Sequence, residues 1–213
     1  VRMFKQFGKS ELLGHSVKVS ERQFSRVNGL AVECAQTLGI VAPTVYIRND
    51  PTLNAGTYGT DDDAFIMVHS ALVDHLTEDE LRGVIGHECG HIHNNHVVYL
   101  TALHFLTQMA GVFVQWIVAP ATMALRAWSR RAEITCDRAE LLCTKNLEVS
   151  QRSLAKLALG SQKLYEQLDL DVFLEQHAES QEGIGRVREL FATHPWLPKR
   201  LLAIRAFSES ALY

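Results

Sequence analysis

The spacing of apolar residues predicts an amphipathic helix over residues 20–38, where apolar side chains recur every three to four positions. Ser20 and Gln23 have the spacing of a capping box at the start of this helix. Gly39 follows the last apolar position and is a typical helix stop. The segment is therefore expected to bury one face and expose the other.

Short runs of β-branched and aromatic residues follow this helix and predict strands. Thr44–Arg48 is one such run, and residues 64–68 form a second that is buried on at least one face. Residues 54–59 are punctuated by glycine and fit either a strand or a loop. Because short strands precede a series of helices, the pattern indicates a mostly helical α+β protein with a small sheet.

The strongest helix signal lies at residues 77–96. Thr77 and Glu80 form a capping box, acidic residues occupy the first turn, and an apolar stripe follows. The mixed pattern of the last third predicts two further helices and a proline-marked loop, at 150–167, 170–190 and 193–200.

Composition excludes several classes of protein. The 213 residues include 21 Lys and Arg and 24 Asp and Glu, for a net charge of −3, and 47% are hydrophobic. The apolar share is too high for a disordered chain, and the near-neutral charge argues against a nucleic-acid-binding protein. The four cysteines form no CxxC pair or dense framework, so a disulfide scaffold is not expected. We expect one domain over residues 1–213.

The chemistry of the chain is concentrated in the sequence HECGH, within the best-marked helix. His87 and His91 are four residues apart, so on a helix their imidazoles face the same side and can bind one Zn²⁺ ion. Glu88 flanks that position without being a comfortable third ligand, which is where a general base for an attacking water belongs. The alternative interpretation is a surface helix with solvated histidines.

Glu133 is the candidate third ligand, because a catalytic zinc ion takes three protein ligands and keeps one open position. Asp137 lies one helical turn further on the same face, where it would accept a ring N–H from a ligand histidine. The alternative for this pair is a solvated acidic face balanced by neighbouring arginines.

Three ordered motifs, HECGH, RRAEITCDRAE and THPWLPKR, resemble the HtpX and CAAX-prenyl-protease family of gluzincin metallopeptidases. The resemblance covers about residues 44–200. It implies a zinc endopeptidase with His87, His91 and Glu133 as ligands and Glu88 as base. The same resemblance places a histidine near the metal and an arginine six residues later, here His194 and Arg200. His194 would stabilise the oxyanion or cap the zinc in a latent state, and Arg200 would assist it or simply hold the loop.

The resemblance also implies a substrate-binding edge strand in front of the zinc helix. A polypeptide in extended conformation would add to this strand by β-augmentation. We expect this strand at residues 64–68. The residues assigned to substrate binding are Asn54, Ala55, Ala64, Phe65, Ile66 and Met67.

Residues 97–128 are an apolar insert between the two metal-binding segments. Residues 97–119 carry no formal charge and are long enough to span a bilayer, and Pro120 interrupts the run. However, ligands on either side of the insert must lie on the same side of a membrane, and 32 residues are too few for two crossings of about 20 residues each. We therefore expect two helices that leave the zinc helix and return. They would be buried in the core or in a homo-oligomer interface, or would make a peripheral membrane contact through Trp116 and Trp128.

The sequence thus predicts a zinc-dependent endopeptidase with one Zn²⁺ per chain and no nucleic-acid partner. The alternative is a non-catalytic or latent peptidase-fold protein that binds other proteins. The first 15 residues are too polar for the core of a signal peptide. We expect a cytoplasmic location or one at a membrane surface, and an exported location if an upstream segment is removed.

Overall fold

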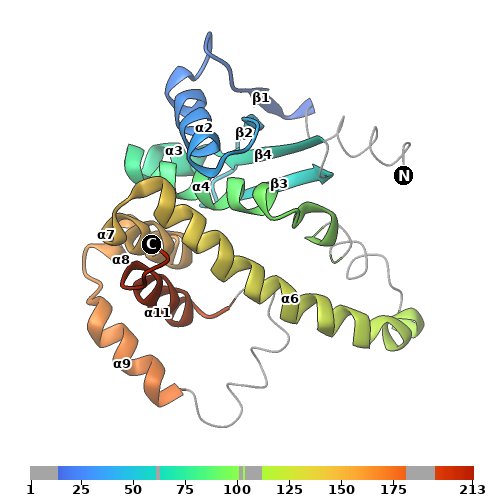
Figure 1. Ribbon diagram of the computed structural model, residues 1–213, viewed down its shortest axis with the longest axis vertical. Coiled ribbons are helices and arrows are strands. Elements are labelled where there is room, and N and C mark those ends of the chain that lie inside the picture. The colour runs from blue at the N-terminus through green and yellow to red at the C-terminus, as the bar shows by residue number, and fades with distance from the viewer. Residues whose placement is uncertain (1–13, 61–62, 101–102, 104–111, 181–194) are drawn as a thin grey trace.

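A small sheet lies beside a set of helices in the computed structural model of the protein (Figure 1). The structure describes residues 14–60, 63–100, 103, 112–180 and 195–213. Helices make up most of these residues, and the strands form a single mixed sheet, which confirms the expected α+β class.

The sheet has the strand order β1-β2-β4-β3. Its members are β1 (Ser16–Lys18), β2 (Thr44–Arg48), β3 (Ala55–Thr60) and β4 (Asp63–His69). β2 and β4 pair in parallel, whereas β1 with β2 and β3 with β4 pair antiparallel. The glycine-punctuated segment is therefore a strand, β3.

The edge strand differs from the expected one. Ala64, Phe65, Ile66 and Met67 lie in β4, which pairs with β2 on one side and β3 on the other. A strand paired on both sides has no free backbone groups for a substrate, so the assignment of residues 64–68 as the edge strand is wrong. The edge strand that contacts the helix carrying His87 and His91 is β3.

Helix α2 (Ser25–Leu38) begins five residues later than expected. Ser20 and Gln23 do not form a capping box but pair through their backbones in an isolated β-bridge. The side chain of Gln23 donates to the carbonyl of Lys18, which closes the turn before the helix. The helix ends as predicted at Gly39, whose φ of 67° fits the left-handed stop.

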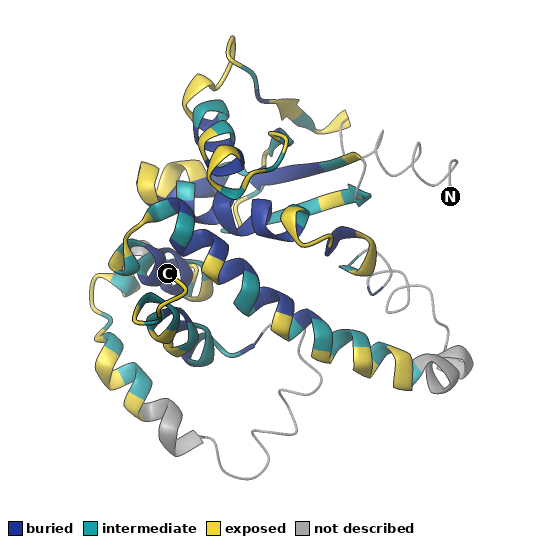
Figure 2. Ribbon diagram, in the orientation of Figure 1, coloured by how far each residue is buried: buried dark blue, intermediate teal, exposed yellow. Residues whose placement is uncertain are grey.

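Helix α4 (Glu78–His93) follows the short helix α3 (Ser70–His75) and confirms the predicted capping box. The Thr77 hydroxyl accepts the amide of Glu80, and the Glu80 carboxylate accepts the amide of Thr77. Most of α4 is buried, as is most of β4 (Figure 2). This helix packs with α2 and the sheet around the main apolar core.

Helix α6 (Val112–Thr144) runs along α4 as one continuous element (Figure 1). Pro120 lies inside it and does not end it, contrary to expectation. Its close approach depends on two glycines of α4, because a Cβ on Gly86 or Gly90 would lie 2.8 Å from the Cβ of Cys143 or Ala139. Small residues at these positions bring the segments that carry the candidate metal ligands side by side.

Part of the expected insert, residues 101–102 and 104–111, lies outside the described residues. Within the part of the chain that the structure describes, no helix is both long and apolar enough to span a bilayer. The contact of residues 97–128 with a membrane surface or a second copy stays a prediction.

Three helices pack at the far side of α6, and a fourth contacts them. They are α7 (Leu147–Leu159), α9 (Leu170–Ser180) and α11 (Leu197–Ser208), with the short α8 (Gln162–Tyr165). A second apolar cluster joins Leu141 of α6, Leu154 of α7 and Leu201 of α11. The expected loop at 193–200 is helical from Leu197 onward. That start places Arg200 on the inner face of α11.

Candidate metal centre and active site

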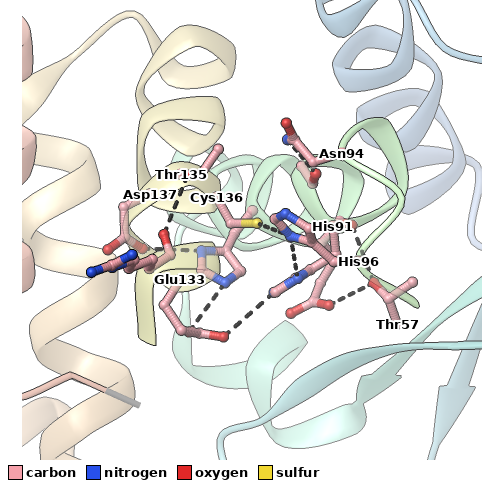
Figure 3. A network of polar contacts seen from close by, with 12 residues as sticks. Thr57, His91, Asn94, His96, Glu133, Thr135, Cys136 and Asp137 are labelled. Carbon is pink, nitrogen blue, oxygen red and sulfur yellow. Dashed lines mark hydrogen bonds and ion pairs between the residues drawn. The ribbon is translucent and has the colours of Figure 1, made fainter. Parts of the chain in front are cut away.

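Helix α4 supplies two buried imidazoles to one face, as the four-residue spacing predicts. The His87 and His91 rings have centroids 5.1 Å apart and are almost fully buried. Each ring directs its Nε2 towards the same carboxylate on α6, that of Glu133 (Figure 3). The His87 Nε2 lies 3.5 Å from Oε2 of Glu133, and the His91 Nε2 lies 3.5 Å from Oε1.

These separations fit a shared metal ion. Ligand atoms about 2.1 Å from a tetrahedral zinc ion lie about 3.4 Å from each other. The two distances of 3.5 Å from the carboxylate of Glu133 to the two imidazoles match that spacing. Two neutral nitrogen donors and one carboxylate form a donor set that zinc accepts, so the residues present fit the metal that the motifs predict.

Two other groups of potential ligand atoms overlap this one. One joins both histidines to Cys136, and the other joins His87 to Asp137 and Glu140; within each group the atoms lie within 4.8 Å of one another. The Cys136 sulfur lies 3.6 Å from Nδ1 of His96, and burial raises the pKa of its thiol well above the usual range, so without a metal ion the sulfur is protonated. Asp137 already carries an arginine partner. Glu133, which faces Nε2 of both histidines, remains the candidate third ligand.

Asp137 lies behind His87, on the other side of its ring. Its Oδ1 is 3.1 Å from Nδ1 of His87, an ion-pair distance at which the ring N–H is not aligned for a hydrogen bond. Arg200 of α11 donates to both carboxylate oxygens, from Nε at 2.9 Å and Nη2 at 2.5 Å. Burial alone would raise the pKa of Asp137, but Arg200 and His87 hold it below its ordinary value. The carboxylate is therefore charged and faces His87.

His87 responds to the same charges. Its burial acts to lower the pKa, yet contacts with Asp137 and Glu133 raise it well above 6.5. A metal ion at Nε2 would have to displace the proton that these carboxylates stabilise.

Glu88 points into the cleft beside the histidines and is held by β3. The hydroxyl of Thr57 donates to Oε2 of Glu88 at 2.7 Å and lies 3.1 Å from its backbone carbonyl (Figure 3). Only 7% of Glu88 is exposed. The bond fixes the candidate base relative to the edge strand, a link that sequence patterns did not indicate.

The cleft has a volume of 630 Å³ and contains the candidate ligands. Residues 53–58 line it together with residues of α4, α6, α7 and α11, and with Leu100, Leu103 and Pro195. Asn54 and Ala55 line this cleft, and their role in substrate binding stays a prediction. None of the described residues that line the cleft belongs to β4, so Ala64, Phe65, Ile66 and Met67 are not brought to it.

Of the two residues expected near the oxyanion, His194 and Arg200, the structure describes only Arg200. His194 lies outside the described residues, and its role stays a prediction. Arg200 lines the cleft, but its Nε and Nη2 both donate to Asp137, and its Nη2 is 3.6 Å from Oε2 of Glu133. This placement favours a structural role for Arg200, which holds its segment against Asp137, over direct contact with the reacting group.

His96 is a residue of the site that sequence reasoning missed. Its place five residues after His91, past the end of the predicted zinc motif, gave no sign of a role. In the structure its Nδ1 lies 3.2 Å from Nδ1 of His91, and only 8% of the residue is exposed. Burial, reinforced by His91, lowers the pKa of His96 to about 4, so this imidazole is neutral.

Glu140 is a second missed residue. It lies in α6 below the candidate metal site and accepts a short hydrogen bond from the hydroxyl of Ser153 in α7. Burial, with the nearby charge of Asp137, raises the pKa of Glu140 to about 7. The sequence signal available was its place one turn after Asp137 on the same helix.

Several known proteins with similar sequences are named as peptidases or proteases. A plastoglobule-localized metallopeptidase 48 of Arabidopsis thaliana is 42% identical over 178 residues, covering 82% of this chain and 52% of the relative. The HtpX protease of Xanthomonas campestris pv. campestris is 28% identical, covering 84% of this chain and 70% of that protein. An HtpX homologue of Streptococcus gordonii is 25% identical, covering 88% and 75%.

The chain thus spans about half the length of the Arabidopsis relative. A family model described as peptidase family M48 matches residues 21–208, which include every candidate site residue named above. This match confirms the resemblance to HtpX-like proteases that the three sequence motifs predict. The chain belongs to peptidase family M48, and its buried pair of histidines lies in a metallopeptidase domain.

Proposed function

We propose that this protein is a zinc-dependent endopeptidase in which Glu88 acts as general base. The observation that carries the proposal is the convergence of the His87 and His91 Nε2 atoms on the carboxylate of Glu133, at 3.5 Å each. The same cleft holds Glu88, whose carboxylate is oriented by Thr57. Ligands and base thus come from two segments that are packed together.

His87, His91 and Glu133 would hold the ion. The chemistry that bound zinc supplies is polarisation of the scissile carbonyl and acidification of the attacking water, whose pKa falls to about 7. Other residues of the chain position the candidate ligands. Asp137 orients His87, and Arg200 keeps Asp137 charged.

Glu88 moves the proton in this scheme. Its carboxylate accepts a proton from the attacking water and delivers it to the nitrogen of the leaving amine. Thr57 donates to one of its two oxygens, which restricts rotation of the carboxylate. Because the donor sits on β3, the position of the base is tied to the strand that we expect to hold the substrate.

The substrate would be a polypeptide in extended conformation along β3. The amide of His69 donates to the carbonyl of Asn54, so Asn54 faces β4. In an antiparallel pair the next residues alternate, and Ala55 and Thr57 therefore direct their backbone groups to the free edge. A peptide that pairs with these groups would run beside Glu88 and the candidate ligands.

The test compares Glu88→Gln with wild-type protein on casein and on a quenched peptide library. General acid–base catalysis contributes about 10²–10⁴-fold, and we expect a loss of that size with zinc content unchanged. Glu78→Gln changes an exposed glutamate of the same helix and should leave cleavage unaltered. Equal signal from wild type and Glu88→Gln would overturn the proposal and favour the alternative of a protein-binding factor without catalysis.

A further inference from the structure

The chain turns sharply at the end of α4. α4 ends at His93, and Asn95 adopts a φ of 54°, in the left-handed region that asparagine tolerates. The amide of His96 then donates to the carbonyl of His91 at 2.9 Å. This turn places a buried imidazole directly against the back of a candidate metal ligand.

The side chain of His96 is packed on several sides. Its ring lies edge-on to Trp128 of α6, with centroids 5.1 Å apart and an interplanar angle of 87°. The Cys136 sulfur lies 3.6 Å from its Nδ1. The ring of His91 is 5.3 Å away, centroid to centroid, with the two Nδ1 atoms 3.2 Å apart (Figure 3). The ring position is therefore set by α6 as well as by the turn.

Two facing ring nitrogens at this distance require one donor and one acceptor. The Nε2 of His91 faces Glu133, so the proton of a neutral, metal-binding His91 belongs on Nδ1. His96 must then accept at Nδ1 and carry its own proton on Nε2. The second candidate ligand, His87, has a carboxylate at the equivalent nitrogen, so the two histidines are supported by different chemistry.

We propose that His96 is a positioning residue that fixes the tautomer and ring orientation of His91 by accepting a hydrogen bond from its Nδ1–H. The proposal rests on the metal site of the proposed function. Groups that orient ligand histidines in this way commonly change metal affinity about 10–100-fold when they are removed.

The experiment measures zinc affinity by competition with a chromophoric chelator, using the full chain. His96→Leu removes the acceptor, and His96→Asn, which has nearly the same shape, restores an acceptor oxygen near the place of Nδ1. We expect His96→Leu to weaken zinc binding about 10–100-fold and His96→Asn to recover most of that loss. His93→Ala, which changes an exposed histidine of the same helix, should bind zinc as wild type does.

The outcomes separate this inference from the proposed function. Should wild-type protein bind zinc and His96→Leu bind it equally well, the inference falls and the metal site stands. The inference also falls if His96→Asn binds as weakly as His96→Leu, because packing rather than the acceptor would then matter. If the wild-type protein does not bind zinc, both the inference about His96 and the proposed metal site are wrong. If His96→Leu does not fold, His96→Phe takes its place, since it keeps the ring against Trp128 without an acceptor.

Discussion

Arg200 of α11 and Asp137 of α6 form a buried two-point ion pair across 63 residues of sequence. Asp137 is fully buried and also contacts His87, so the pair links the C-terminal helix to a candidate metal ligand. The ordered arrangement Arg200–Asp137–His87 explains how a segment far along the chain can set the geometry of the zinc helix.

Removing the arginine should destabilise the protein strongly. Arg200→Gln leaves the Asp137 carboxylate buried without its partner, and breaking such a pair costs about 3–5 kcal/mol of unfolding free energy. Arg200→Lys keeps the charge but loses the planar two-point contact, so an intermediate loss is expected. Urea unfolding measures both. Arg205→Gln serves as control, because Arg205 pairs only at 3.8 Å with the exposed Asp171, and a loss equal to that of Arg200→Gln would refute the prediction.

Substrate pairing along β3 can be tested with proline. Ala55→Pro removes an amide that faces the free edge, and edge strands tolerate proline there. We expect a higher KM for extended peptides with little change in the unfolding free energy, because the β3–β4 ladder does not use that amide. Lys18→Pro makes the same change on the other edge strand, at a residue that also faces outward, since Val19 is the one bonded to β2. Equal KM values for both variants and wild type would contradict pairing along β3.

Glu140 should make stability depend on pH. Its pKa is about 7 in the folded protein against 4.5 ordinarily, so the folded state binds more protons between these values. Protonated Glu140 therefore favours the folded state, and this contribution to the unfolding free energy is complete below pH 4.5. It is lost as the pH rises through about 7, and the total loss is up to about 3 kcal/mol. Glu140→Gln should flatten this fall in urea unfolding at several pH values. Glu148→Gln, at an exposed glutamate, should leave it as in wild type, and a Glu140→Gln curve parallel to wild type would count against the prediction.

Local signals in the sequence predicted local structure well. Thr77 and Glu80 marked the start of α4, and Gly39 marked the end of α2, because capping depends on residues close in sequence. The histidine spacing placed His87 and His91 on one face for the same reason. Ser20 and Gln23 show the limit, since the same spacing formed a bridge before the helix instead.

Features set by pairing across the chain were harder to predict. A hydrophobic run identified β4 as a strand but not its neighbours, so Phe65 and Ile66 were assigned to an edge that belongs to β3. The candidate third ligand, Glu133, was predicted from the order of the motifs, whereas the approach of its helix to α4 depends on glycines such as Gly90. His96 escaped notice because its contact with His91 exists only after the turn at Asn95 is formed.

Metal content measured by mass spectrometry tests the central claim most directly, that His87, His91 and Glu133 share one ion. Wild-type protein, dialysed against a weak chelator, should retain one zinc ion per chain, and Glu133→Gln should lose it while staying folded. Glu148→Gln, treated in the same way, should retain it. Stoichiometric zinc in Glu133→Gln under these conditions would show that Glu133 is not a ligand and would contradict the account.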